Sequence, residues 1–124
     1  STGVVVGDVL KLREKFPKIF DEWLKTMKIL VEEGYLCLKE KNFDKFAELM
    51  NINHGLLNAI GVSCYELEKV VFELRKYYKG AKLSGKGRGG IAIGFGKKEN
   101  VNDLKNLNLI NARICNEGVR IEEE

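Results

Sequence analysis

The sequence predicts an α+β domain: a four-stranded antiparallel sheet of the ferredoxin-like split β-α-β kind, with several helices on one side. Three observations lead to this class. Two short apolar runs flank a glycine-rich loop between residues 80 and 95, which is typical of a strand–loop–strand unit. Apolar residues follow a helical repeat over residues 17–41. β-Branched or apolar runs suited to strands stand near both ends of the chain.

The composition fits a single globular domain over residues 1–124. Apolar residues make up 44% and charged residues 31%, which suffices for a core and a soluble surface. The net charge of +3 suits an anionic ligand but does not by itself indicate nucleic acid. Three cysteines without C-x-x-C spacing and one histidine predict no metal site. No membrane-spanning run or signal segment is visible, so we expect a cytoplasmic protein with neither membrane nor nucleic acid as partner.

The first third of the chain is expected to hold a strand followed by helices. The β-branched run Thr2–Gly7 is bounded by glycines and predicts a short strand. Asp8 would cap a helix that runs to about Lys15, and Pro17 would begin the next one. From Pro17 to Lys41 the apolar residues recur at helical spacing, which predicts an amphipathic helix with a broad buried face.

The next predicted helix carries an unusual group of polar residues. Asn42 is suited to cap it. The polar residues lie among apolar ones at Asn51, Asn53, His54 and Asn58. Asparagine is a mediocre helix former, so this clustering needs a reason. One interpretation is a polar edge that faces a cleft; the other, favoured by the spacing alone, is a set of interhelical hydrogen bonds with a buried histidine.

A further helix is expected after Gly61, which is suited to the position following a helix end. Ser63 and Glu66 have capping-box spacing, so this helix would begin there and run to about Tyr78. Its solvent side would carry the basic residues Lys69, Arg75, Lys76 and Lys79.

The glycine-rich loop is the main candidate for function. It joins the predicted strands Ala81–Leu83 and Ile91–Phe95, and it holds four glycines together with Lys86 and Arg88. Glycine lets other groups approach the backbone closely, so such a loop can turn several N–H groups toward an anion. The alternative is a plain hairpin loop with solvated charges, and the loop alone does not decide between them.

The C-terminal segment completes the predicted sheet. Lys97–Leu107 predicts at best a short helix, and Asn111–Cys115 predicts a strand. Val119–Ile121 would continue that strand beyond a turn. The resulting order of strand, helices, two strands, short helix and strand is the split β-α-β arrangement.

Two blocks of the sequence resemble a known family. The first is Met50–Ser63, with the sequence MNINHGLLNAIGVS, and the second is Gly80–Gly90, with the sequence GAKLSGKGRGG. Both blocks, and the helix between them, are similar to the C-terminal half of GHMP-type small-molecule kinases, most closely mevalonate kinases. The chain differs at Lys86 and Arg88, where this family usually has alanine and glycine. Weaker similarity at both ends extends the resemblance over nearly the whole chain.

The resemblance implies a C-terminal domain whose N-terminal ATP-binding domain is absent from this chain. The family's Pro-x-x-x-Gly-Leu-x-Ser-Ser phosphate loop does not occur here, nor does the half that supplies the catalytic aspartate and lysine. We therefore expect no catalytic residue and no activity in the isolated chain. Its role would be that of a fragment or split subunit of a mevalonate kinase, which phosphorylates mevalonate with ATP and Mg²⁺ in isoprenoid biosynthesis. Expected partners are mevalonate and the N-terminal half, as a separate chain or a fused segment, and a homodimer with a second copy of this chain is left open.

The resemblance also implies roles for particular residues. The ATP-phosphate loop would consist of Ser84, Gly85, Lys86, Gly87, Arg88, Gly89 and Gly90. Lys86 and Arg88 would add positive charge near the γ-phosphate. Asn53 and His54 would lie toward the mevalonate pocket, where they would orient the substrate. A missing half further predicts an exposed, partly apolar face on this domain.

Other functions remain open at this point. The chain could be half of a phosphomevalonate kinase or of another GHMP kinase. It could also be a non-catalytic ferredoxin-like module that binds a small ligand or RNA. An RNA-binding sheet needs aromatic residues on which bases stack, and Phe95 is the one aromatic residue placed for that role.

Overall fold

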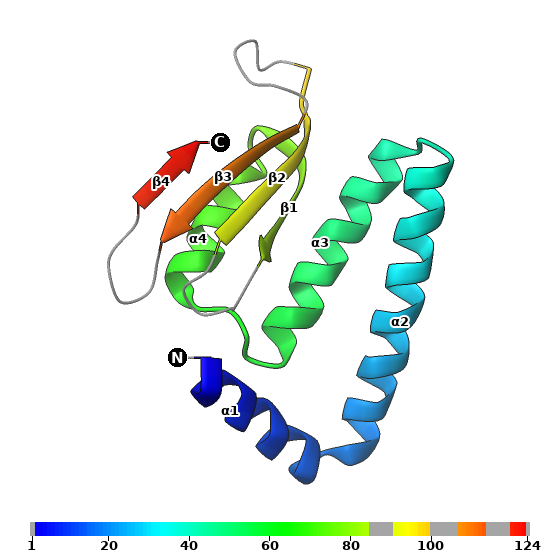
Figure 1. The fold of residues 1–124 in the computed structure, drawn as a ribbon, viewed down its shortest axis with the longest axis vertical. Coiled ribbons are helices and arrows are strands. Elements are labelled where there is room, and N and C mark those ends of the chain that lie inside the picture. The colour runs from blue at the N-terminus through cyan, green and yellow to red at the C-terminus, as the bar shows by residue number, and fades with distance from the viewer. Residues whose placement is uncertain (1, 85–90, 100–106, 114–119, 124) are drawn as a thin grey trace.

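The computed structural model describes residues 2–84, 91–99, 107–113 and 120–123. Within these residues the helices are α1 (Thr2–Lys15), α2 (Pro17–Lys39), α3 (Phe43–Ala59) and α4 (Tyr65–Leu74). The strands follow as β1 (Tyr78–Ser84), β2 (Ile91–Lys97), β3 (Leu107–Arg113) and β4 (Arg120–Glu123). In Figure 1, α2 and α3 form an antiparallel pair beside the sheet, and α4 lies behind it. None of the described helices combines the length and the apolarity needed to cross a bilayer.

The strands are arranged in the order of the chain. They pair as β1-β2-β3-β4, and each pair is antiparallel. Helices packed with an antiparallel sheet are thus present as predicted, but the split β-α-β order is wrong. All the described helices precede the first strand, and β2 extends to Lys97, where a short helix was expected to begin. Lys98 and Glu99 are not helical and Leu107 begins β3, while residues 100–106 of that expected helix lie outside the described part of the chain.

The predicted strand at the N-terminus is wrong, because Thr2–Gly7 belongs to α1. Val5 is buried, and Val9 and Leu12 are partly buried, whereas Val6 is half exposed. Positions 5, 9 and 12 have the spacing of one helix face. The helical pattern therefore outweighs the strand preference of the β-branched residues, which is a weak preference that depends on packing.

The ends of α3 confirm two predicted caps. The Asn42 side chain accepts a hydrogen bond from the Lys45 N–H at 3.3 Å, which satisfies one free donor of the first turn. Gly61 follows the helix with a φ of 83°, a conformation that favours glycine. The predicted capping box before α4 is wrong. Cys64 stands at the N-cap position, and the Ser63 hydroxyl donates to Glu68 instead of capping the helix.

The helices contact both faces of the β1–β2 pair, where the sequence predicted one. The main core lies between α4 and the sheet and consists of Leu67, Val70, Val71, Leu74, Tyr78, Ala81, Leu83 and Ala92. Gly80 of β1 faces α3 rather than this core. A Cβ atom at Gly80 would meet the backbone of Ala47 in α3. On the same side, the Phe95 ring packs edge-on against Phe43 and Phe46, with ring centroids 6.1 and 5.2 Å away.

Candidate functional site

The hairpin of β1 and β2 positions the two ends of the glycine-rich loop. Its last pair is Ser84 opposite Ile91, so residues 85–90 connect two hydrogen-bonded neighbours. Ser84 is partly buried at the end of β1. The remaining loop residues predicted to contact phosphate, Gly85 to Gly90 with Lys86 and Arg88, lie outside the described residues. The structure does describe the side chains that hold β1, the strand that leads into this loop.

Asn51 and Arg75 bind the edge of β1 that does not pair with β2. The Asn51 side-chain amide donates to the Lys79 carbonyl at 3.0 Å, and its oxygen accepts the Ala81 N–H at 2.9 Å. Arg75 donates from Nε to the Asn51 oxygen at 3.0 Å and from Nη2 to the Ala81 carbonyl at 3.2 Å. These contacts take the place of a neighbouring strand, because backbone groups away from water need partners.

His54 continues this series of contacts one step nearer the loop. Its Nδ1 accepts the Leu83 N–H at 3.0 Å, and its Nε2 lies 2.5 Å from Oε2 of Glu68. The same carboxylate oxygen accepts a hydrogen bond from the Ser63 hydroxyl. His54 is only 2% exposed, so the whole ring is enclosed between α3, α4 and β1.

These contacts determine the protonation state of His54. Nδ1 must be unprotonated to accept a hydrogen bond, so the proton of the neutral ring is on Nε2, which donates to Glu68. Burial lowers the pKa of His54 from its ordinary value of 6.5. The Glu68 carboxylate acts in the opposite direction, and the charges of Arg75 and Lys82 add to the lowering.

Acidification below pH 6.5 is expected to destabilise the fold through His54. The unfolded chain binds the proton at a higher pH than the folded one, so the free energy of unfolding falls as the pH drops below about 6.5. One proton limits the slope to about 1.4 kcal/mol per pH unit. Urea unfolding between pH 5 and 7.5 measures this slope. His54→Gln removes the titration but not the surrounding carboxylates, so identical slopes in the variant and the wild type would contradict the prediction.

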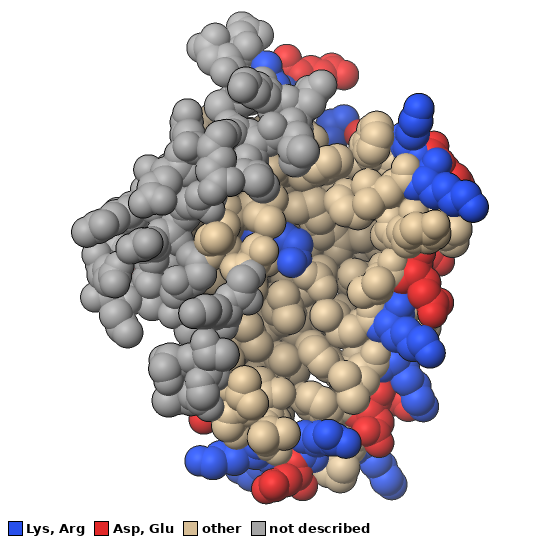
Figure 2. Space-filling model, viewed as in Figure 1, with Lys and Arg blue, Asp and Glu red and all other residues tan. Residues whose placement is uncertain are grey.

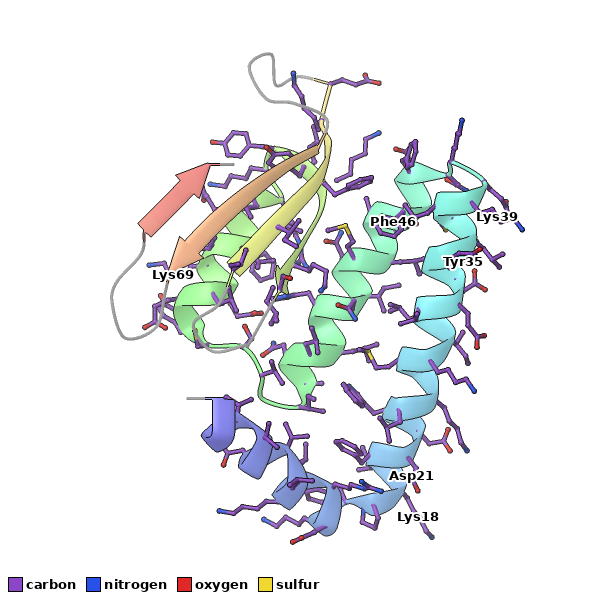
Figure 3. All side chains as sticks on the ribbon, in the orientation of Figure 1. Lys18, Asp21, Tyr35, Lys39, Phe46 and Lys69 are labelled. Carbon is purple, nitrogen blue, oxygen red and sulfur yellow. The ribbon has the colours of Figure 1, made fainter. Side chains whose placement is uncertain are left out.

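Asn53 lies on a different side of α3, in an apolar groove between α2 and α3. The groove has a volume of about 370 Å³. It is lined by Leu30, Val31, Gly34, Tyr35, Leu38, Phe46, Leu49, Met50, Asn53 and Lys82. Figure 3 labels two of these residues, Tyr35 on α2 and Phe46 on α3. The Asn53 amide nitrogen lies 3.7 Å from the Met27 sulfur. Lys82 reaches the groove from β1 as the only charged residue among those that line it, and burial lowers the pKa of its ammonium.

The groove is part of a broad exposed apolar face. Val31, Tyr35 and Leu38, which line the groove from α2, are 64%, 66% and 48% exposed. Figure 2 shows mostly uncharged residues on this face, with charged side chains gathered along the side where α2 lies. Apolar surface of this extent on a single chain is typical of an interface.

The structure thus separates the residues that the sequence grouped together. Of the two predicted substrate-pocket residues, Asn53 lines the groove, whereas His54 is buried and bonded to backbone and Glu68. Arg75 was expected in solvent but binds Asn51 and β1. Lys82 was not singled out by the sequence. The one signal that could have identified Lys82 is its place between the apolar Ala81 and Leu83. Successive side chains of a strand point to opposite faces, so Lys82 must lie on the face opposite to these two residues.

Comparison with protein families identifies one match. The family model described as "GHMP kinases C terminal" matches residues 35–107. These residues include both sequence blocks, the C-terminal end of α2, all of α3 and α4, and the strands β1 and β2.

Named relatives and solved structures are similar over most of the chain. The mevalonate kinase of Pyrococcus abyssi is 37% identical over 134 aligned residues, which cover 99% of this chain and 40% of the relative. That of Saccharolobus solfataricus is 30% identical and covers 96% and 39%. The crystal structure of L. major mevalonate kinase in complex with R-mevalonate matches 74% of this chain and 28% of that one, with a TM-score of 0.72 and 42% identity. The Methanococcus jannaschii mevalonate kinase matches 70% and 25%, with a TM-score of 0.57 and 33% identity. The chain spans about 40% of the length of the curated relatives named here.

Proposed function

Because the chain belongs to the GHMP kinase C-terminal family, we propose that it is the C-terminal part of a mevalonate kinase-like enzyme. The observation that carries this proposal is the likeness to mevalonate kinases along 99% of the chain, together with the structural match to a mevalonate kinase over 74% of the chain. In the assembled enzyme the chain supports ATP-dependent phosphorylation of mevalonate, in the cytoplasm, where ATP is available.

The proposed contribution of the hairpin is to hold the phosphates of ATP. Ser84 ends β1 opposite Ile91 on β2, and the glycine-rich segment joins these two residues in the sequence. Its glycines and two cations suit a polyphosphate, since backbone N–H groups and positive side chains stabilise the charge of the transferred group. The N-terminal part would supply the catalytic aspartate and lysine and most of the ligands of Mg²⁺, which neutralises phosphate charge in such enzymes.

The proposed contribution of Asn53 is to orient mevalonate. Its side chain lines the apolar groove, and an amide there can donate to and accept from a small hydroxy acid. His54 does not take this role, because both ring nitrogens are engaged by Leu83 and Glu68. We assign it to holding β1.

The proposed partner is the N-terminal part of the kinase, as a separate chain or a fused segment. The relatives extend well beyond the matched region, and the α2–α3 face exposes apolar side chains that a second domain would cover. A second copy of this chain is the alternative, and light scattering of the purified chain distinguishes a monomer from a homodimer.

Reconstitution tests the proposed function. The N-terminal part of the Pyrococcus abyssi enzyme is mixed with, or fused to, this chain, and ADP release is measured with mevalonate and with phosphomevalonate. We expect mevalonate-dependent activity from the combination and none from the chain alone. The matched parts of the P. abyssi enzyme serve as the positive control. Activity of the isolated chain, or an inactive combination beside an active control, would refute the proposal.

Arg88→Ala in the reconstituted enzyme is expected to raise the KM for ATP about tenfold. The reason is the loss of a charge-assisted contact to phosphate, which is worth roughly 1.5 kcal/mol or more. Lys97→Ala is the matched control, because Lys97 lies on β2 opposite Tyr78, at the far end of the hairpin from the loop. Steady-state kinetics at varied ATP concentration measure both variants. An unchanged KM and kcat for Arg88→Ala would remove Arg88 from the phosphate site.

A further inference from the structure

We infer that Glu68 is a positioning residue, which holds the loop-proximal end of β1 by fixing the tautomer of His54. This inference rests on the proposed function for its consequence in catalysis. The geometry of the contacts is independent of the proposed function, because the described residues show it directly.

The first step of the argument is the direction of the hydrogen bonds. Leu83 donates its backbone N–H to Nδ1 of His54 at 3.0 Å. Nδ1 can accept only if the ring carries its proton on Nε2. The tautomer with the proton on Nδ1 would place two donors face to face and would break the contact to β1.

The second step is the preference for one tautomer. In water the two neutral tautomers interconvert freely, and the group that each nitrogen meets decides between them. Nε2 of His54 meets Oε2 of Glu68, which as a carboxylate oxygen can only accept. Glu68 is in turn held by the Ser63 hydroxyl, which donates to the same oxygen. The carboxylate therefore selects the tautomer that leaves Nδ1 free for Leu83.

The third step is the place of this contact in the fold. Leu83 is 2% exposed and immediately precedes Ser84, the final residue of β1. Asn51 and Arg75 hold β1 nearer its start, at Lys79 and Ala81. The His54 contact is the one that lies next to the loop-proximal end. A loss of this contact would loosen the strand end from which the proposed phosphate loop departs, while the rest of β1 stays bound.

The test compares Glu68→Ala, Glu68→Gln and a matched control. Glutamine keeps an acceptor for the His54 Nε2–H, whereas alanine removes it. Glu66→Gln is the control, because Glu66 lies in the same acidic first turn of α4 and loses the same charge. In the isotope-labelled chain, NMR reports the His54 tautomer from the imidazole nitrogens and the hydrogen exchange of the Leu83 amide. In the reconstituted kinase, the KM for ATP and kcat are measured for each variant.

The expected result is a specific pattern. Wild type, Glu66→Gln and Glu68→Gln keep the Nε2–H tautomer, whereas Glu68→Ala loses this preference. Its Leu83 amide then exchanges about tenfold faster, as expected for one lost hydrogen bond. Its KM for ATP rises severalfold while kcat changes less, and Glu68→Gln restores the value of the wild type.

Three outcomes would overturn the inference. The first is a wild-type His54 with its proton on Nδ1. The second is a Glu68→Ala variant with unchanged tautomer and unchanged Leu83 exchange. The third is an active reconstituted enzyme in which the tautomer changes but the KM for ATP does not. If the wild-type combination is inactive, the proposed kinase function fails, and the NMR pattern alone then decides whether Glu68 positions β1.

Discussion

Gly80→Ala is expected to destabilise the chain by about 3 kcal/mol or more, as overpacking against an immobile neighbour does. A Cβ atom at this position would lie 2.4 Å from the carbonyl oxygen and 2.8 Å from the Cα atom of Ala47. Both atoms belong to the backbone of α3, and Ala47 is fully buried, so neither can move aside as a flexible side chain would. The substitution must therefore separate α3 from β1. Urea and thermal unfolding measure the loss.

Gly55→Ala on α3 is the matched control for this prediction. No heavy atom lies within 4 Å of a Cβ atom at Gly55, and the residue is in the interior of the helix. Alanine there should stabilise the chain by roughly 0.5–1 kcal/mol, because it restricts the unfolded chain more than glycine does. The two variants make the same chemical change and are expected to differ in sign. Equal stabilities would show that the contact between Gly80 and Ala47 does not limit the packing.

Asn51→Ala is expected to cost about 2–3 kcal/mol. The substitution removes three hydrogen bonds at once, and it leaves the Lys79 carbonyl, the Ala81 N–H and Nε of Arg75 without their partner. Unfolding experiments measure the loss, and hydrogen exchange of the Ala81 amide should rise in parallel.

Asn58→Ala provides the comparison, because Asn58 is an exposed residue on the same helix. Its replacement should change the stability by no more than about 0.5 kcal/mol, as is usual for surface positions. If Asn51→Ala and Asn58→Ala behave alike, the contacts of Asn51 to β1 add nothing to stability.

Much of the helical part of the fold can be predicted from the sequence, because its signals are local. The periodic segments that form α2 and α3 have the expected type, and Asn42 and Gly61 stand at the helix ends where their chemistry suits them. The hairpin of β1 and β2 is also where the apolar runs place it. Each of these features depends on residues a few positions apart.

The features that were mispredicted depend on distant partners. Thr2–Gly7 has the composition of a strand, but it forms the start of α1, where Val5, Val9 and Leu12 share one helix face. Arg75 is a charged residue of a type that is usually exposed to solvent. Its Nε instead donates a hydrogen bond to Asn51, which lies 24 positions away in the sequence. No local pattern contains such a contact, because it exists only once α3, α4 and β1 have been brought together.

The candidate site was also predicted only in part. The polar cluster on α3 is visible in the sequence, and each of its two interpretations, a polar edge beside a cleft and a set of structural hydrogen bonds, holds for some of its residues. Asn53 lines a groove, whereas Asn51 and His54 make structural hydrogen bonds. Whether a residue of the cluster lines the groove or bonds to β1 depends on the rotation of α3 relative to β1. That rotation cannot be predicted from the local sequence. The phosphate role of residues 84–90 stays a prediction.

The hydrogen bonds along the outer side of β1 also limit how this molecule can associate. A bare terminal strand can template a strand from another copy, and sheets then grow into aggregates. On β1 the Lys79 carbonyl, both backbone groups of Ala81 and the Leu83 N–H are already hydrogen-bonded to side chains of α3 and to Arg75 at the end of α4. Growth of the sheet from that side would require these side chains to leave first. Association at this end of the molecule is therefore expected through the exposed apolar side chains of α2 and α3 rather than through the edge of β1.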